Sequence, residues 1–451
     1  PLVVDHEGMT LIVVCDEMAD ETYIHENHVY VGVGGVTPDG QPMVSPNGKS
    51  HTHIDPEGVA KTHNTKCIEG YPDETLPKVN IGGGGKAIPE EHIDGPADLS
   101  VLGTPYGYGW YKVELSNSAT KKLKVMAPES SDRVSVFLDG AHVGIFGAGP
   151  GAEDVLTLPL KKGNQELVML ADNMGRVDAG SDMTAHKGVY GHLIEEVPFK
   201  VSKGAIENGD PIEILGYRTP VFGLQRGDST HHGRITWTFK HLKKSSIVVD
   251  LPAFGVRTMV ILNDEPIRLY DANKRQRLVL DHETINRGNN TLQIAFENNA
   301  ISDDGDAYVA AALKLMNDQG GFYEASNAIT DKVEWAFAKW EAPAEIDFDS
   351  VSKSKLSNTD TPTWWRSSFD TPDVKVALNL DLTGMTKGQV YVNGHAAGRY
   401  FVATSDGKGV DGVLPLAIQR DWLNTDEENT LTIFDEHGAS PAKAKIIVER
   451  C

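Results

Sequence analysis

The fold is decided by a short stretch, residues 133–140, which reads RVSVFLDG. Apolar and polar side chains alternate along it, as they do in a strand with one buried face. The stretch runs into Asp139-Gly140. An Asp-Gly pair favours the tight type I′ turn, whose positive φ angles match the twist of paired strands. The stretch therefore predicts a β-hairpin.

The same unit recurs twice more in the chain. An aromatic strand precedes each hairpin, beginning at Trp110, Ile235 or Trp364, and a polar turn with a further alternating strand follows it. The later hairpin strands read RTMVILND (257–264) and QVYVNG (389–394), and the three closing strands read NQELVML (164–170), NNTLQIAF (289–296) and NTLTIF (429–434). Period-2 alternation with turn residues at fixed places is typical of antiparallel β-sandwiches. The sequence thus predicts an all-β protein built from tandem sandwiches.

These repeats divide the chain into four predicted domains. Residues 1–95 form a small loop-rich β domain, and the three sandwiches occupy 96–205, 206–345 and 346–451. We expect one short linking helix near Asp331, because Val333, Ala336, Phe337 and Trp340 follow the i, i+3, i+4, i+7 pattern.

Composition narrows the choice of partners. The 451 residues carry a formal charge of −22, which argues against nucleic acid or an anionic membrane surface as the main partner. No apolar run reaches the roughly 20 residues of a membrane span. Three cysteines, Cys15, Cys67 and Cys451, cannot form a disulfide framework, and one pair or three free thiols both stay open. The chain starts at Pro1 without a signal peptide, which indicates a processed N-terminus, and we expect an extracellular or cell-surface protein.

Two blocks of sequence resemble a known family. DRVSVFLDGAHVG (132–144), LVMLADNMGRVDAG (167–180) and KGVYG (187–191) resemble the β-domains of family-35 β-galactosidases. PTWWR (362–366), KGQVYVNGH (387–395), GRYF (398–401) and DWL (421–423) are similar to the C-terminal jelly roll of the same enzymes. The resemblance covers about residues 100–200 and 360–450. It implies galactose-binding-like jelly rolls.

The resemblance has departures and a limit. Asp178-Ala179 stands where the family usually has Asn-Tyr, and Phe401 stands where it has Trp. The family carries its catalytic carboxylates on a (β/α)₈ barrel, and no part of this chain alternates strand and helix periods over such a length. We therefore assign no catalytic residue and expect this chain alone not to be an enzyme.

Sugar recognition needs a planar apolar patch flanked by fixed donors and acceptors. The residues that could supply them are Trp110, Trp364, Trp365, Asn393, His395, Arg399 and Tyr400. Neighbours on a strand point to opposite faces, so we expect one of the paired tryptophans in the core; an exposed platform is one reading of the other. The alternative is that the Asn-Gly pair only makes the turn and that His395 and Arg399 cap loops.

Metal sites are a further hypothesis. His51 and His53 would share one face of an extended segment, with His63 following, which suits zinc or copper; the alternative is solvated loop histidines. Asp304 and Asp306 resemble part of a calcium loop, although no glutamate closes it, so the alternative is an acidic turn. Otherwise we expect no cofactor.

We thus expect a non-catalytic carbohydrate-binding or accessory region, whose partner is a glycan, a glycoprotein or a separate catalytic chain. The alternative is a self-associating structural protein, a surface, filament or particle component, because jelly rolls offer long loops for subunit contacts on rigid cores.

Overall fold

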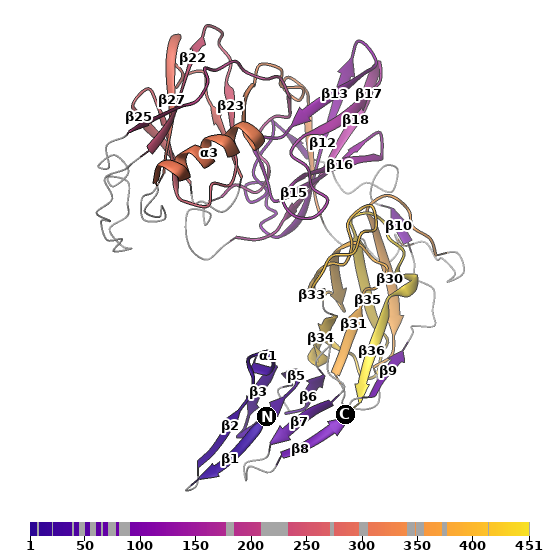
Figure 1. Ribbon diagram of the computed structural model, residues 1–451. Coiled ribbons are helices and arrows are strands. Elements are labelled where there is room, and N and C mark those ends of the chain that lie inside the picture. The colour runs from indigo at the N-terminus through magenta and orange to yellow at the C-terminus, as the bar shows by residue number, and fades with distance from the viewer. Residues whose placement is uncertain are drawn as a thin grey trace. The chain divides into compact units, whose positions relative to one another are not determined.

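The computed structural model (Figure 1) separates into two compact units, residues 1–87 with 341–451, and residues 88–340. The residues that it describes are 1–6, 9–19, 21–37, 40–44, 50–54, 60–64, 66–70, 78–80, 91–176, 185–208, 233–270, 275–296, 305–340, 348, 356–371, 377–413 and 415–450. Each unit is built from antiparallel sheets, as the sequence predicts.

The first sandwich belongs to the unit 88–340 and pairs a large sheet with a small one. The six strands of the large sheet, in spatial order, are β11 (Glu91–Ile93), β29 (Trp335–Lys339), β12 (Gly107–Asn117), β18 (Gly163–Asn173), β15 (Arg133–Leu138) and β16 (Ala141–Gly147). The other strands are β17 (Leu156–Leu160), β13 (Lys121–Met126) and β20 (Ile194–Glu195), with the pair β14 (Ser130–Ser131) and β19 (Gly188–Val189).

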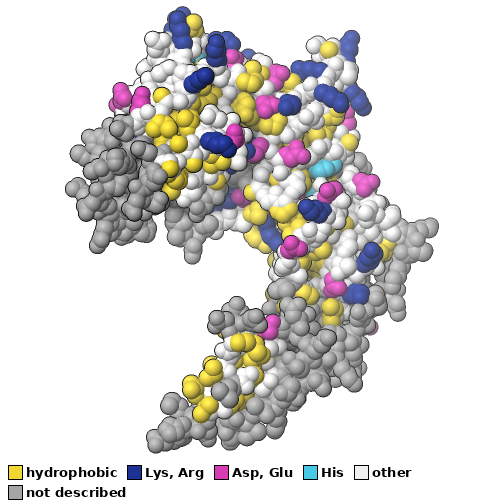
Figure 2. Space-filling view, viewed as in Figure 1, with side chains coloured by type: hydrophobic (Ala, Val, Ile, Leu, Met, Phe, Trp, Pro, Cys, Tyr) yellow, Lys and Arg dark blue, Asp and Glu magenta, His cyan; other side chains and the backbone are white. Residues whose placement is uncertain are grey.

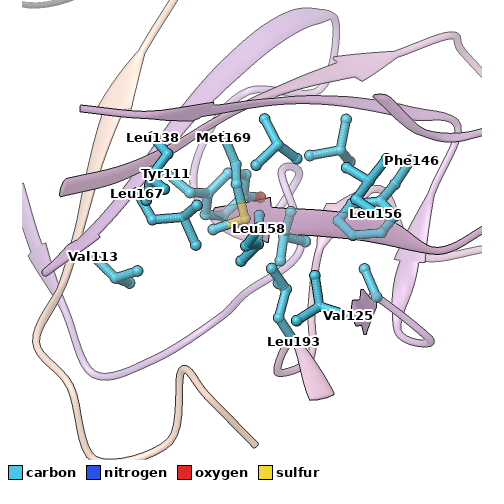
Figure 3. Packing of buried hydrophobic residues seen from close by; sticks show 14 of the residues in the cluster. Tyr111, Val113, Val125, Leu138, Phe146, Leu156, Leu158, Leu167, Met169 and Leu193 are labelled. Carbon is cyan, nitrogen blue, oxygen red and sulfur yellow. The ribbon is translucent and has the colours of Figure 1, made fainter. Parts of the chain in front are cut away.

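The core of this sandwich lies between the two sheets (Figure 3). Tyr111, Val113 and Met169 from the large sheet pack against Val125 and Leu158 from the small one. All five side chains are buried because each occupies the inward position of its alternating strand. The alternation read in the sequence therefore produces this core.

The second sandwich repeats the arrangement and adds a helix. Its strands are β21 (Ala205–Asn208), β22 (Gly233–His241), β27 (Gly288–Phe296), β24 (Thr258–Leu262) and β25 (Glu265–Tyr270) in one sheet, and β26 (Gln276–Leu280), β23 (Ile247–Leu251) and β28 (Gly321–Glu324) in the other. The helix α3 (Gly305–Gln319) packs Val309, Ala312 and Met316 into this core, at helical spacing.

A polar network and an apolar cluster join these two sandwiches. Asp154 of the first sandwich contacts Arg275 and Arg277 of the second. Beside them, Met126 and Val248 belong to one buried cluster. These contacts between the two sandwiches explain why residues 88–340 form a single compact unit.

The third sandwich belongs to the other unit. Its five-stranded sheet has β10 (Lys78–Asn80), β30 (Thr363–Phe369), β35 (Asn429–Asp435), β32 (Lys387–Val392) and β33 (His395–Phe401), and its four-stranded sheet has β34 (Leu416–Ile418), β31 (Ala377–Asp381), β36 (Lys445–Arg450) and β9 (Lys66–Gly70). The 3₁₀ turns η6 (Arg420–Trp422) and η7 (Pro441–Lys443) connect its strands. Strands β9 and β10 come from the first hundred residues, so this sandwich draws on both ends of the sequence.

The rest of the N-terminal segment makes small sheets. A four-stranded sheet has β3 (Thr22–His25), β4 (His28–Val31), β7 (Ser50–Ile54) and β8 (Ala60–Asn64), and two hairpins are β1 (Leu2–His6) with β2 (Met9–Val13) and β5 (Val33–Val36) with β6 (Pro42–Val44). A short helix, α1 (Asp16–Ala19), follows the first hairpin.

The expectation of a helix near Asp331 is wrong. Residues 335–339 form β29, which pairs with β12 and sets Phe337 opposite Tyr111. Trp335 and Phe337 alternate into the first core, and this strand alternation prevails over the helical spacing because a vacant edge of β12 is available to pair. The long helix is α3 instead.

The threefold repeat is visible in the hairpin turns. Each first turn residue has a positive φ, 50° at Asp139, 51° at Asn263 and 49° at Asn393, as a type I′ turn requires. Its side-chain oxygen accepts a backbone N–H from the closing strand in every unit, and the donors are Glu166 at 2.9 Å, Thr291 at 2.9 Å and Thr430 at 2.7 Å. Each hairpin also has a β-bulge shortly before its turn. The repeat read in the sequence is thus a structural repeat.

The surface in Figure 2 carries basic and acidic side chains interspersed over its described part. Such mixing leaves no broad field of one sign on this face. Among the helices that the structure describes, none combines the length and the hydrophobicity that crossing a membrane requires.

Candidate functional site

The tryptophans expected to face a ligand are buried. Trp110 on β12 is 7% exposed, and Trp364 and Trp365 on β30 are 0% and 1% exposed. Trp365 lies in the core of the third sandwich. Trp364 lies on the other face of the same sheet, where its ring centroid is 5.0 Å from that of Phe434. The expectation of an exposed platform is therefore wrong, because this sheet is covered on both faces where β30 runs.

Tyr400 is also internal. Its hydroxyl lies 2.8 Å from the carbonyl oxygen of Phe434 and 2.9 Å from Oδ2 of Asp435, which is fully buried. Burial, and then the neighbouring Asp435 carboxylate, hold the pKa of Tyr400 well above its usual value. Arg399, the preceding residue on β33, is half-buried. Tyr400 therefore serves the fold and presents nothing to a ligand.

Asn393 is occupied by the turn that it makes. Its amide nitrogen donates to the carbonyl of Trp422 at 2.6 Å and to Oδ1 of Asn429 at 2.8 Å, while its oxygen accepts the N–H of Thr430. An amide nitrogen has two donor hydrogens, and both are used. Asn393 thus positions the turn and the chain around Trp422.

His395 is the exposed member of the predicted set. Its ring stacks on Trp422 with centroids 5.4 Å apart and an interplanar angle of 10°. Trp422 is half-buried on η6 and is itself anchored through Asn393. The pair presents aromatic surface and an imidazole edge at one end of the third sandwich, which is suitable chemistry for a sugar ring and its hydroxyls. The sequence contains Trp422 in the DWL motif, but pattern alone did not mark it as a site residue.

The candidate metal residues fall partly outside the described side chains. The register of β7 and β8 sets His51 opposite His63, and His53 lies two residues along the same strand. Asp304 lies outside the described residues. Asp306 belongs to α3, but its side chain is not among those that the structure describes. Among the side chains that the structure describes, no group of three or more His, Cys, Asp or Glu is arranged for a metal.

A hollow in the first sandwich brings together residues far apart in the sequence. Its volume is about 530 Å³, within the range of small-molecule sites. The residues that line it are Asp94, Gly95, Pro96, Glu129, Tyr190, Gly191, His192, Thr330, Asp331, Lys332, Val333 and Trp335. Backbone contacts assemble them: the N–H of Tyr190 donates to the carbonyl of Glu129 at 3.0 Å, and β11 pairs with β29.

Hydrogen bonds of Thr330 and the close approach of Gly191 to Glu129 hold the hollow in shape. The hydroxyl of Thr330 accepts the N–H of Leu193 at 3.0 Å and lies 3.3 Å from Nδ1 of His192, and the carbonyl of Thr330 accepts Nε1–H of Trp335 at 3.2 Å. A Cβ on Gly191 would lie 2.3 Å from Glu129, so only glycine allows this approach.

The electrostatics of the hollow are set by its acids. Burial, with the nearby Asp281 carboxylate adding repulsion, raises the pKa of Glu129 above its usual value. Burial likewise raises the pKa of Tyr190 to about 12, so its hydroxyl stays neutral. A second hollow of about 520 Å³ shares Asp331, Lys332 and Val333 with the first. Sequence reasoning missed both because their walls come from segments that no local pattern connects.

Two family models match the chain. Residues 96–199 match "Beta-galactosidase, first all-beta domain", and residues 362–429 match "Beta-galactosidase, galactose-binding domain". The second match includes Asn393, His395 and Trp422.

Curated relatives match over a short segment. Beta-galactosidase 7 of Oryza sativa subsp. japonica is 36% identical over 84 residues, which is 19% of this chain and 11% of that protein. Beta-galactosidase 13 of Arabidopsis thaliana is 34% identical over 94 residues, 21% of this chain and 11% of that protein. The matched segments thus span only about a tenth of the length of these relatives.

Among solved structures, a GH2 β-galacturonidase from Eisenbergiella tayi, bound to galacturonate, shares 15% identity and a TM-score of 0.20. The match covers 48% of this chain and 37% of that one. A score this low carries no argument about fold or function.

Proposed function

We propose that this chain, which carries two accessory β-domains of the β-galactosidase kind, binds carbohydrate without cleaving it. The observation that carries the proposal is the galactose-binding domain match at residues 362–429 together with the stack of exposed His395 on half-buried Trp422 inside it. We assign ring stacking to this pair, and positioning of Trp422 to Asn393.

The non-catalytic part of the proposal has separate support. Every strand pair in the described residues is antiparallel, whereas a (β/α)₈ barrel requires parallel strands. Catalytic carboxylates of the family type would therefore come from a barrel outside these residues. In this proposal the chain acts outside the cell or at its surface, where it holds a glycan, a glycoprotein or a catalytic partner chain.

The test is binding of methyl β-galactoside and of a galactan by the intact chain, measured by isothermal titration calorimetry. His395→Ala removes one exposed ring and should weaken binding roughly three- to tenfold, the worth of about one aromatic contact. His282→Ala, at another exposed histidine, is the matched control and should change nothing. Absence of binding at millimolar sugar would contradict the proposal, and turnover of a chromogenic galactoside would contradict its non-catalytic part.

A second candidate, a self-associating assembly protein, is favoured by the β1–β2 hairpin. Val4, Leu11 and Val13 on this two-stranded sheet are 42%, 56% and 47% exposed, and a lone hairpin with an apolar face is marginal in water. Native mass measurement decides between the two: an oligomer that Leu11→Ser dissociates supports assembly, whereas a stable monomer excludes it.

A further inference from the structure

The hollow beside Glu129 lies in the unit 88–340, whereas the His395–Trp422 stack belongs to the other unit. Three of its lining side chains are carboxylic acids, Asp94, Glu129 and Asp331, and Lys332 is the one lysine among the residues that line it. Negative charge therefore dominates this hollow when the acids are ionised.

Aromatic groups form another part of its wall. The half-buried rings of His192 and Tyr190 form it, and Tyr190 is a neutral phenol; Trp335, which is 2% exposed, packs its ring 6.2 Å from that of His192 in the core. A site with ring faces, a phenol hydroxyl and several carboxyl oxygens offers both the apolar contact and the hydrogen bonds that a polyhydroxylated ring needs.

We propose that this hollow binds a saccharide unit that carries no negative charge, and that it prefers an amino sugar to a neutral one. The volume, aromatic wall and polar groups favour a sugar ring, while the excess of carboxylates repels a uronate and attracts a protonated amine. The inference deepens the proposed function, because it adds a second saccharide site in a different sandwich.

The order of preference also follows from the position of Glu129. Its carboxyl is half-buried and lies close to Gly191, so water screens it less than an exposed carboxylate when it meets a ligand amine. Asp94 is exposed at the rim, where it attracts the same charge from a more solvated position.

The experiment uses the full chain carrying His395→Ala, in which binding at the stack of the third sandwich is weakened. Calorimetric titrations at neutral pH compare galactosamine, methyl β-galactoside and galacturonate. We expect the affinity order galactosamine, then galactoside, then galacturonate. Adding Glu129→Gln or Asp94→Asn should each reduce the galactosamine preference roughly two- to fivefold. Glu265→Gln, at an exposed acid of the second sandwich, is the matched control and should leave the order unchanged.

Three outcomes would overturn the inference: no residual binding in the His395→Ala chain, galacturonate binding as tightly as galactosamine, or a preference that neither acid variant changes. Asp94 is exposed, so Asp94→Asn tests the same preference a second time at a position where the substitution leaves the packing unchanged. The proposed function fails differently, through a His395→Ala chain that binds galactoside as well as the unmodified chain does.

Discussion

Asp250 and Arg275 form a bidentate pair: Nε of Arg275 donates to Oδ1 and Nη2 donates to Oδ2, both at 2.7 Å. Asp250 is 1% exposed, and Arg275 also contacts Asp154 of the first sandwich. The buried carboxylate of the second sandwich is thus neutralised by an arginine that joins it to the first.

Arg275→Ala should lower the free energy of unfolding of the chain by about 2–3 kcal/mol, because among the described residues it leaves buried Asp250 with Arg277 as its ion-pair partner, whose Nε is 3.5 Å away. Denaturant unfolding followed by tryptophan fluorescence measures the change. Lys314→Ala breaks an exposed pair with Asp318 on α3 and is the control, with an expected cost below about 0.5 kcal/mol. Equal losses of unfolding free energy in the two variants would show that the Asp250–Arg275 pair contributes no more than an exposed ion pair does.

Glu129→Gln should stabilise the chain at neutral pH. Since the folded-state pKa of Glu129 is raised above its ordinary 4.5, the folded chain binds more protons than the unfolded chain between the two values. The contribution of Glu129 to the unfolding free energy therefore falls as the pH rises through that window, and glutamine has no such loss. Denaturation from pH 4 to 8 should show the variant gaining in unfolding free energy over the unmodified chain as the pH rises. A gain that does not vary with pH would refute this assignment.

Tyr400→Phe should reduce stability by about 1–2 kcal/mol without changing galactoside affinity. The variant removes one donor from the buried Asp435, which still accepts from Thr386 and from the N–H groups of His437 and Ala439. Thermal unfolding and calorimetry measure the two effects, with Tyr23→Phe as an exposed-tyrosine control. A loss of affinity at unchanged stability would instead return Tyr400 to the sugar site that the sequence predicts.

The metal site stays a prediction that the strand register makes testable. The register sets His51 opposite His63, with His53 two residues along the same strand, and imidazoles are ligands that Zn²⁺ and Cu²⁺ accept. Titration with Zn²⁺ should show one site per chain, with affinity lowered about tenfold or more in His51→Ala and in His63→Ala. His92→Ala, at an exposed histidine of β11, is the control, and identical heats in all four proteins would exclude the site.

The predictions that succeeded rest on local chemistry. Asp139-Gly140 and Asn393-Gly394 specify type I′ turns because few residues accept two consecutive positive φ angles, and the structure has both turns. The helix predicted near Asp331 is wrong because the helical spacing of Val333, Ala336, Phe337 and Trp340 overlaps a short strand in which Trp335 and Phe337 alternate into the core. Only the vacant edge of β12 decides between them.

The residues of the candidate site likewise divide into those that local sequence predicts and those that it does not. His395 was predicted and is exposed, but its stacking partner Trp422 lies 27 residues later on η6, beyond any local pattern. Trp364 and Trp365 were rightly placed on opposite faces, yet alternation says nothing about whether both faces are covered.

The sequence by itself therefore determined the hairpins, their threefold repetition and the β-galactosidase resemblance, because turn geometry and alternation are properties of neighbouring residues. Only the tertiary structure decided which aromatic rings stay exposed and that Asp94, Glu129, Tyr190 and Asp331 meet around one hollow. Burial and cavity shape depend on which distant segments pack against a given face, and that is a property of the whole fold.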